Sequence, residues 1–317
     1  MHTVLRSATR EVVIGPDQPF CIIGERINPT GRPKFQERLR AGDLSQVEDD
    51  VRAQLAGGAM VLDINMGVPL ADEADLLARA IKLVQGMTDL PICIDSSVVE
   101  ALEAGLEAYQ GKALVNSVTG ETERLDAILP LVKRYGAAVI ALPNEEDEIP
   151  EDPRKRLEIT RKILDIATGK YDIPPEDVVI DPLAMPIGAN HEYGRWTMEA
   201  MSLIRDELGL NMTCGASNVS FGMPGRHALN ATFLPMAMTA GLTSAIMDAR
   251  TPQIVEAVKA ADLFLAHDEW GANWIGLHRA KQAAAKAAEA AAAEAAEVAS
   301  PVAAAEAEAA QGSSATA

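Results

Sequence analysis

Short apolar runs alternate with longer amphipathic stretches along most of this chain, and the alternation repeats eight times. Apolar runs bounded by turn residues predict strands, and the longer stretches, such as 73–87, carry apolar residues at helical spacing. Repeated strand and helix pairs are the pattern of a parallel sheet with helical crossovers. Eight such units within roughly 250 residues favour a closed (β/α)8 TIM barrel over an open doubly wound sheet. The predicted strands span residues 20–25, 59–65, 91–95, 112–117, 137–142, 177–182, 212–217 and 243–249.

The barrel is predicted over residues 20–278, after an N-terminal lead-in at 1–19. From Arg279 onward the composition changes abruptly to alanine with scattered charges, which cannot supply a second core. Because alanine has the highest helix propensity, we expect this low-complexity tail, 279–317, to be helical before Pro301 and disordered after it. A solubilising spacer is the favoured role of the tail, and a docking helix is the alternative.

The chain carries 28 Lys and Arg against 46 Asp and Glu, which gives a net charge of −18. Such a surface repels phosphate backbones and anionic membranes, so nucleic acid is not an expected partner. The three cysteines, Cys21, Cys93 and Cys214, lie far apart in strand-like runs without a CxxC pair, which is typical of core thiols in a reducing cytoplasm. Nowhere do about 18 apolar residues run together, so the sequence predicts a soluble, cytoplasmic protein without a signal peptide or membrane span.

Polar residues stand at nearly every predicted strand end, where barrel enzymes carry their chemistry. For any one of them, capping of the following helix is an equally good interpretation. Together they would line one cavity rich in carboxylates and amides, without a histidine or lysine. They are Glu25, Asn28, Asp63, Asn65, Asp95, Asn116, Asp181, Asn218 and Asp248.

This set of side chains excludes several chemistries. A Schiff-base enzyme needs a lysine in the barrel mouth, and Lys112 opens its strand at the wrong end. A zinc or iron site is typically built with histidine ligands, and no histidine stands at a predicted strand end. Carboxylates could hold a magnesium ion, but we predict no metal. The motifs GxGxxG and GxxxxGK[ST] are both missing. What remains is a pocket that hydrogen-bonds a flat, neutral, donor-rich heterocycle, and a reduced pterin presents such an edge.

Seven motifs in register narrow this interpretation, from about residue 20 to residue 267. They are IGERINPTGRPKF (23–35), VLDINMG (61–67), ICIDSS (92–97), ALVNSV (113–118), VIDPL (179–183), GASNVSF (215–221) and GRHALNATFLPMAMTAGL (225–242). In order and spacing they resemble the pterin-binding family of methyltetrahydrofolate–corrinoid methyltransferases. Within that family the chain most resembles the methyltransferases that serve separate corrinoid proteins, and INPTGRPKF and SNVSF are also similar to the folate domain of cobalamin-dependent methionine synthase.

The resemblance implies a (β/α)8 barrel whose mouth binds the pterin of 5-methyltetrahydrofolate. Asp95, Asn116 and Asp181 are then expected to bind the pterin edge, and Asn218 to reach N5, the nitrogen that carries the methyl group. Arg226 is expected to help close the site or to meet the folate tail. The substrate-binding set is completed by Glu25, Asn65 and Ser217.

A neutral amide suits the chemistry that the resemblance implies for Asn218. Displacing a methyl group from N5 needs a proton or a strong hydrogen bond on that nitrogen as the bond breaks. The nucleophile, Co(I), is itself open to protonation by a strong acid. An amide donor stabilises the developing charge in the transition state without acting as a free acid. We therefore expect Asn218 to be the catalytic residue.

The chain lacks a cobalamin-binding DxHxxG signature, so the resemblance implies a corrinoid carried by a partner protein that docks over the mouth. Family members are homodimers, and a homodimer is expected here. One departure is Phe221, which stands where many stand-alone members have glutamine and methionine synthases have phenylalanine. Packing beneath the loop and stacking on a cofactor are both open to it.

Two rival functions are weighed against methyl transfer. Dihydropteroate synthase shares the barrel and pterin site, but it typically carries an Arg-Lys pair where this chain has Asn218-Val219, and its first loop reads like NVTPDSFSDGG. The other rival is a pterin-binding scaffold protein that docks through the alanine-rich tail. Binding alone does not require an amide aimed at the methylated nitrogen, so Asn218 disfavours the scaffold.

Overall fold

The computed structural model of the protein describes residues 1–145, 149–287 and 289–291. It contains two compact units, Met1–His267 and the segment from Asp268 onward. In the second unit the short 3-10 helix η3 (Glu269–Gly271) is followed by helical backbone at 272–287 and 289–291. The predicted disorder after Pro301 lies outside the described residues.

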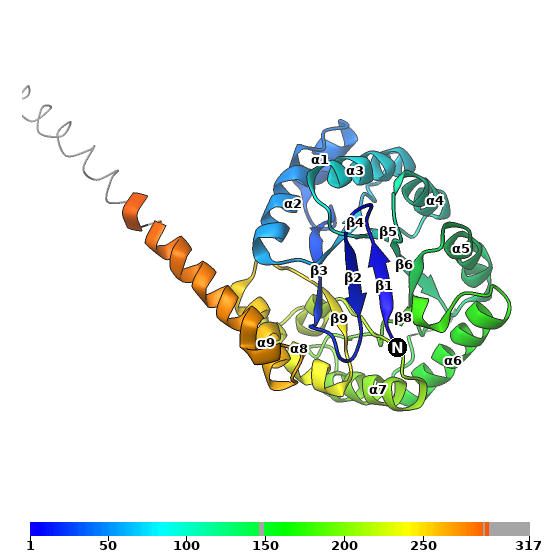
Figure 1. Ribbon diagram of the computed structural model, residues 1–317. Helices are drawn as coiled ribbons and strands as arrows, with labels where there is room; N and C mark the ends of the chain where they lie inside the picture. Colours follow the sequence, from blue (N-terminus) through cyan, green and yellow to red (C-terminus); the bar gives the residue numbers. More distant parts are fainter. Residues whose placement is uncertain (146–148, 288, 292–317) are drawn as a thin grey trace, which may run out of the picture. The chain divides into compact units, whose positions relative to one another are not determined.

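A parallel sheet of seven strands forms the centre of the first unit (Figure 1). Six of its strands follow the chain in order, and the last strand, β9, pairs with the first, β3. The strands are β3 (Cys21–Ile27), β4 (Val61–Asn65), β5 (Ile92–Asp95), β6 (Leu114–Thr119), β7 (Ala138–Leu142), β8 (Val178–Ile180) and β9 (Ser244–Met247). Each overlaps one of the predicted strand regions, and β3 and β6 extend two residues beyond theirs.

The predicted strand at 212–217 is the exception. This segment forms only isolated parallel bridges, Met212 with Ile180 of β8 and Gly215 with Ile246 of β9. The chain then turns into the 3-10 helix η2 (Ala216–Ser220), so too few residues remain extended for a regular ladder. The segment nevertheless links the two edges of the sheet, and the curled sheet has the TIM-barrel-like arrangement that the sequence predicted.

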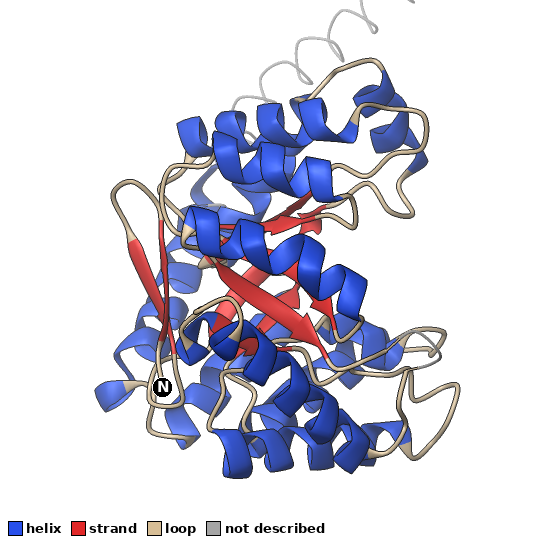
Figure 2. Ribbon diagram, turned by 90° about the vertical axis from the view of Figure 1, so that its right-hand side faces the viewer, coloured by secondary structure: helices blue, strands red, loops and turns tan. Residues whose placement is uncertain are grey.

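Helices surround the sheet on its outer side (Figure 2). The helix α3 shows why these stretches fold as they do, because the Asp72 side chain caps it by accepting from the Asp75 amide, and its apolar stripe is buried. Two helices, α1 and α2, stand between β3 and β4. The helices are α1 (Pro33–Arg40), α2 (Ser45–Gly57), α3 (Glu73–Met87), α4 (Val99–Ala108), α5 (Thr122–Tyr135), α6 (Pro153–Gly169), α7 (Tyr193–Leu208), α8 (Arg226–Ala240) and α9 (Pro252–Phe264), with the 3-10 turn η1 at Pro175–Asp177.

The lead-in at 1–19 forms an antiparallel hairpin that the sequence pattern did not predict. Its strands, β1 (Thr3–Arg6) and β2 (Glu11–Ile14), lie against the amino-terminal end of the sheet, where Arg6 bridges Lys112 (Figure 2). Leu5, Val12 and Ile14 join a buried cluster with inward-facing strand residues such as Cys21 and Cys93. All three cysteines are buried and free, as predicted for core thiols. The hairpin therefore closes the amino end, and the mouth at the other end stays available.

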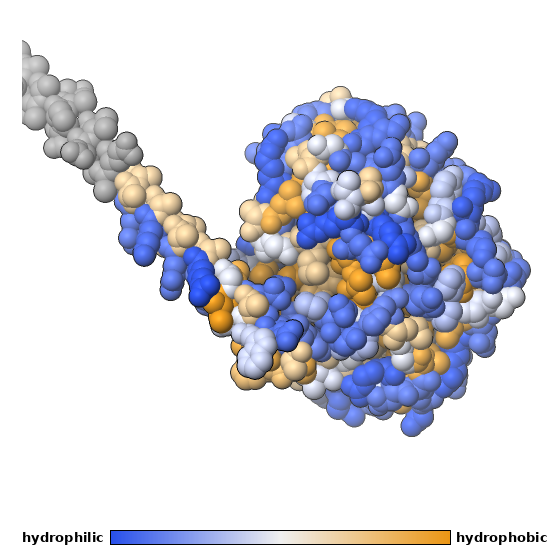
Figure 3. All heavy atoms as spheres, viewed as in Figure 1, coloured by the Kyte–Doolittle hydropathy of each residue, from blue (hydrophilic) through white to orange (hydrophobic). Residues whose placement is uncertain are grey.

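Hydrophilic side chains cover much of the hairpin-bearing face of this unit (Figure 3). Among the described residues no helix is both long and apolar enough to cross a bilayer.

Candidate functional site

Three predicted residues stand side by side at the carboxyl ends of neighbouring strands. Asn65 of β4 is in register with Asp95 of β5, and Asp95 is in register with Asn116 of β6. The Asn65 Nδ2 donates to Asp95 Oδ2 at 3.0 Å, and the Asn116 Nδ2 donates to Asp63 Oδ1 at 3.2 Å. The side-chain amides of Asn65 and Asn116 therefore each donate one hydrogen bond to a carboxylate within the site.

This pairing decides which atoms remain for a ligand. Asn65 Oδ1 also accepts from the Gly67 amide at 2.8 Å, so that side chain is largely committed to the protein. In the part of the chain that the structure describes, no hydrogen bond reaches Asp95 Oδ1 or Asn116 Oδ1. The strand ends of β5 and β6 thus offer acceptors, which favours a ligand edge that carries N–H donors.

Asp63 belongs to this network, although the sequence placed it at a strand end without assigning it a role. It is only 2% exposed, and burial followed by the neighbouring Asp95 charge raises its pKa well above the ordinary value. Burial likewise raises the pKa of Asp95, while the Asn65 hydrogen bond lowers it. The available signal was the alternation along β4, since Asp63 and Asn65 are two residues apart and share one face of the strand.

Asp181 contributes another acceptor beyond the end of β8. Its Oδ1 accepts from the Leu183 amide at 2.8 Å, across a turn in which Leu183 has a φ of 63°. Burial raises the pKa of Asp181 to about 6, while the Leu183 amide and the Arg156 charge lower it. Within the described residues no hydrogen bond reaches its Oδ2.

The loop of η2 forms the other side of the mouth. The Ser217 hydroxyl donates to both carboxylate oxygens of Glu25, at 3.1 and 3.2 Å. Burial raises the pKa of Glu25, the Ser217 bond lowers it, and the Glu25 charge in turn acts on Asp63 across the mouth. The structure therefore brings the β3 end, the β4 end and the η2 loop together at the carboxyl end of the sheet.

Asn218 is the exposed member of this loop. Its backbone is fixed, because its amide donates to Gly215 O at 3.0 Å and its carbonyl accepts from Phe221 N at 3.1 Å. A Cβ on Gly215 would lie 2.9 Å from Asn218 Nδ2, so only glycine leaves the amide group in this position. No hydrogen bond to the Asn218 side chain occurs among the described residues. The backbone of Asn218 is held in place, and its side-chain amide remains free to donate.

Arg226 binds the loop itself. Its Nη2 donates to Ser217 O at 2.8 Å and its Nε to Ser220 Oγ at 3.1 Å, and its guanidinium lies 5.8 Å from the centre of the Phe221 ring. Phe221 is 67% exposed, so the alternative that it packs beneath the loop is wrong. An exposed aromatic ring leaves stacking on a cofactor as the remaining alternative for Phe221.

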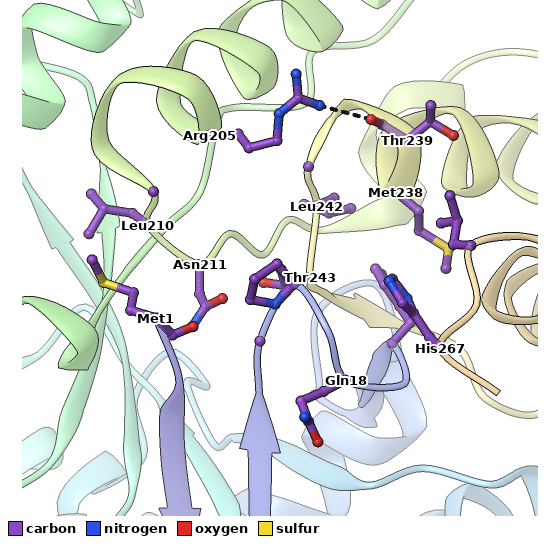
Figure 4. A pocket seen from close by; sticks show the side chains of 16 residues that line it. Met1, Gln18, Arg205, Leu210, Asn211, Met238, Thr239, Leu242, Thr243 and His267 are labelled. Atoms are coloured by element: carbon purple, nitrogen blue, oxygen red, sulfur yellow. Dashed lines mark hydrogen bonds between the residues drawn. The ribbon is translucent and has the colours of Figure 1, made fainter. Parts of the chain in front are cut away.

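A separate pocket of about 330 Å³ lies near the hairpin, away from these residues (Figure 4). Its lining includes Arg205, Asn211 and His267. The Asn211 Nδ2 donates to Ile14 O at 2.9 Å and to Thr3 Oγ1 at 3.0 Å, and the Arg205 Nη1 donates to Thr239 O at 2.9 Å. Because its polar groups serve the hairpin and helix ends, we interpret this pocket as part of the scaffold.

Comparisons with known proteins agree with the fold and show the family. A family model described as pterin binding enzyme matches residues 24–248. A methylcorrinoid:tetrahydrofolate methyltransferase from Eubacterium limosum is 30% identical over 250 residues, covering 78% of this chain and 92% of that protein. Among solved structures, a dihydropteroate synthase of Yersinia pestis superposes with a TM-score of 0.61 at 14% identity, covering 84% of this chain and 100% of that one. The enzyme of Xanthomonas albilineans in complex with 7,8-dihydropteroate gives 0.62 at 18% identity, covering 83% and 99%.

Proposed function

Because the chain belongs to the pterin binding enzyme family, we propose that it moves the N5 methyl group between 5-methyltetrahydrofolate and the cobalt of a corrinoid carried by a partner protein. The name of the Eubacterium limosum relative supports this choice within the family. The dihydropteroate synthase structures support only the barrel, because their sequence identity to this chain is low.

The free acceptors in the mouth fit the donor edge of a pterin. The ring presents an exocyclic amine and adjacent ring N–H groups in one plane. Asp95 Oδ1, Asn116 Oδ1 and Asp181 Oδ2 are three acceptors of the matching kind, and two of them belong to carboxylates, whose hydrogen bonds are the stronger ones. In this proposal Asn65 and Asp63 orient the acceptors, and Glu25 and Ser217 line the opposite wall.

The free amide of Asn218 is the observation that carries the proposal. The loop fixes the Asn218 backbone, and its side-chain amide, which has no hydrogen-bond partner among the described residues, can turn to N5 and stabilise the charge that develops there as the methyl group leaves. An amide donates this hydrogen bond without acting as a free acid toward the Co(I) nucleophile, which the partner protein's corrinoid supplies. Dihydropteroate synthases typically carry an Arg-Lys pair where this chain has Asn218 and Val219, so the loop favours methyl transfer over pteroate synthesis.

The corrinoid partner has to approach over the mouth, past the exposed ring of Phe221. Homodimer formation remains a prediction of the family resemblance, and a cytoplasmic location remains a prediction of the cysteine usage and of the lack of a long apolar run in the sequence.

The test is methyl transfer from 5-methyltetrahydrofolate to free Co(I) cobalamin, catalysed by the purified protein in the absence of oxygen. We expect loss of the Co(I) absorbance together with formation of tetrahydrofolate. Formation of pteroate from the pterin pyrophosphate ester and p-aminobenzoate, without methyl transfer, would replace the proposal with dihydropteroate synthase. If the protein binds methyltetrahydrofolate but transfers no methyl group, even when reduced corrinoid proteins are supplied, the result would favour the pterin-binding scaffold protein instead.

A further inference from the structure

Arg156 of α6 is a fully buried arginine, with 0% of its surface exposed. Its Nε donates to Pro150 O at 2.7 Å, and its Nη1 donates to Pro182 O at 2.7 Å and to Leu183 O at 2.9 Å. Its Nη2 is buried without a hydrogen-bond partner among the described residues. Two of the three acceptors are the carbonyls that directly follow Asp181.

These contacts fix the turn that orients Asp181. Leu183 adopts a left-handed φ of 63°, a conformation that a leucine keeps only where its surroundings determine it. Arg156 binds the carbonyls of residues 182 and 183, and the Leu183 amide then points at Asp181 Oδ1. The second oxygen of Asp181 accepts no hydrogen bond from the described residues.

Arg156 also places a positive charge near this carboxylate. No carboxylate lies within 4.0 Å of its nitrogens in the described residues, so it has no direct ion pair to offset its burial. The groups whose charges act on it are Asp181, Tyr193 of α7 and Glu151 before α6. The Tyr193 hydroxyl donates to Glu151 at the surface. The pKa of Tyr193 and the pKa of the nearby Cys214 thiol are both raised, so Tyr193 and Cys214 carry no negative charge at neutral pH. Asp181 is the buried counter-charge.

We propose that Arg156 is a positioning residue for the substrate site: it clamps the 182–183 turn and keeps Asp181 charged, so that Asp181 Oδ2 can accept from a pterin. The role of Asp181 toward a pterin rests on the proposed function. The effect of Arg156 on the 182–183 turn and on the Asp181 carboxylate does not. Arg156 touches no ligand in this scheme and acts only through Asp181.

The first experiment needs no ligand. Protein labelled with ¹³C at the aspartate carboxyl is titrated by NMR, with the Asp181 signal identified by its loss in Asp181→Asn. In the unaltered protein we expect a midpoint near 6. Arg156→Gln removes the charge and should move the midpoint to higher pH. Arg156→Lys keeps a cation and should leave the midpoint near that of the unaltered protein. Arg161→Gln, which removes an exposed arginine from the same helix, is the matched control and should also leave it unchanged.

The second experiment measures methyltetrahydrofolate affinity across pH. Arg156→Gln should move the acid limb of binding to higher pH, and Arg156→Lys should lower affinity about tenfold at every pH, because an ammonium group cannot reproduce the guanidinium's hold on both carbonyls. An unmoved Asp181 midpoint in Arg156→Gln overturns the proposal. If Arg156→Gln does not fold, unaltered affinity in Arg156→Lys overturns it instead. Failure of the unaltered protein to bind methyltetrahydrofolate would overturn the proposed function, and the NMR titration would still test Arg156.

Discussion

Replacing Asn218 by alanine removes one fixed donor and nothing else that the described structure uses. The side chain is exposed and accepts or donates no internal hydrogen bond, so its loss should change the free energy of unfolding by no more than about 0.5 kcal/mol. If the amide donates to N5 mainly in the transition state, losing it should slow methyl transfer roughly 10- to 1000-fold, the range found for a single pre-positioned donor. Substrate affinity should fall much less.

The matching Asn218→Asp variant separates donation from shape. An ionised carboxylate has the same outline but no proton for N5, so we expect a slow variant whose residual rate rises as the pH falls and the acid becomes a donor. A suitable control is Asn190→Ala, because the Asn190 side chain only accepts from the Glu192 amide in its own loop.

The assay is single-turnover transfer from methyltetrahydrofolate to free Co(I) cobalamin, which removes partner docking from the measurement. Melting temperatures recorded in parallel should agree among all variants. Transfer at the unaltered rate in both Asn218 variants would mean that the residue only shapes its loop, and the proposed mechanism would have to be abandoned.

Other perturbations address the rest of the site and the scaffold. Asp181→Ala should weaken methyltetrahydrofolate binding by about 1–3 kcal/mol in calorimetry, since a ligand donor loses its acceptor; unchanged affinity would remove Asp181 from the site. In the unaltered protein, binding should need the ionised carboxylate, whose pKa burial raises to about 6, so affinity is full above that pH and falls about tenfold per unit below it; a flat profile from pH 5 to 8 would contradict this. Gly57→Ala would place a Cβ 2.1 Å from Ala249 O and should lower the melting temperature by several degrees, whereas Gly86→Ala, with open space at its Cβ, should not. Deleting 279–317 should leave melting and methyl transfer nearly unchanged, because the first compact unit ends before that segment; a large fall in melting temperature would show that the segment packs on the barrel.

Much of the barrel could be predicted because its signal is local. Strands buried on both faces read as continuous apolar runs, and the helices between them show their own spacing, as in α3. The segment 212–217 looks the same in sequence. Whether it pairs regularly depends on the positions of β8 and β9 and on the turn that begins at Gly215, neither of which a local pattern contains.

The hairpin at the amino end escaped prediction for a related reason. Charged residues interrupt its apolar residues, and two strands of four residues give little alternation to count. Their burial comes from the barrel interior, which exists only after the sheet has closed. The same holds for Phe221, because the geometry of the η2 loop and Arg226 decides whether the ring is covered or exposed.

The sequence by itself determined the chemical groups of the mouth, since strand ends in such a barrel converge wherever the βα rhythm is kept. It placed Asp95, Asn116 and Asp181 there, and Asn218 beside them. Only the tertiary structure decided which atoms of these groups are free. Hydrogen bonds between neighbouring strand ends occupy one oxygen of Asp95 and the amide nitrogen of Asn116, and the turn that Arg156 holds directs the Leu183 amide at one oxygen of Asp181. Most of these pairings depend on contacts that residues far apart in the chain make only when folded.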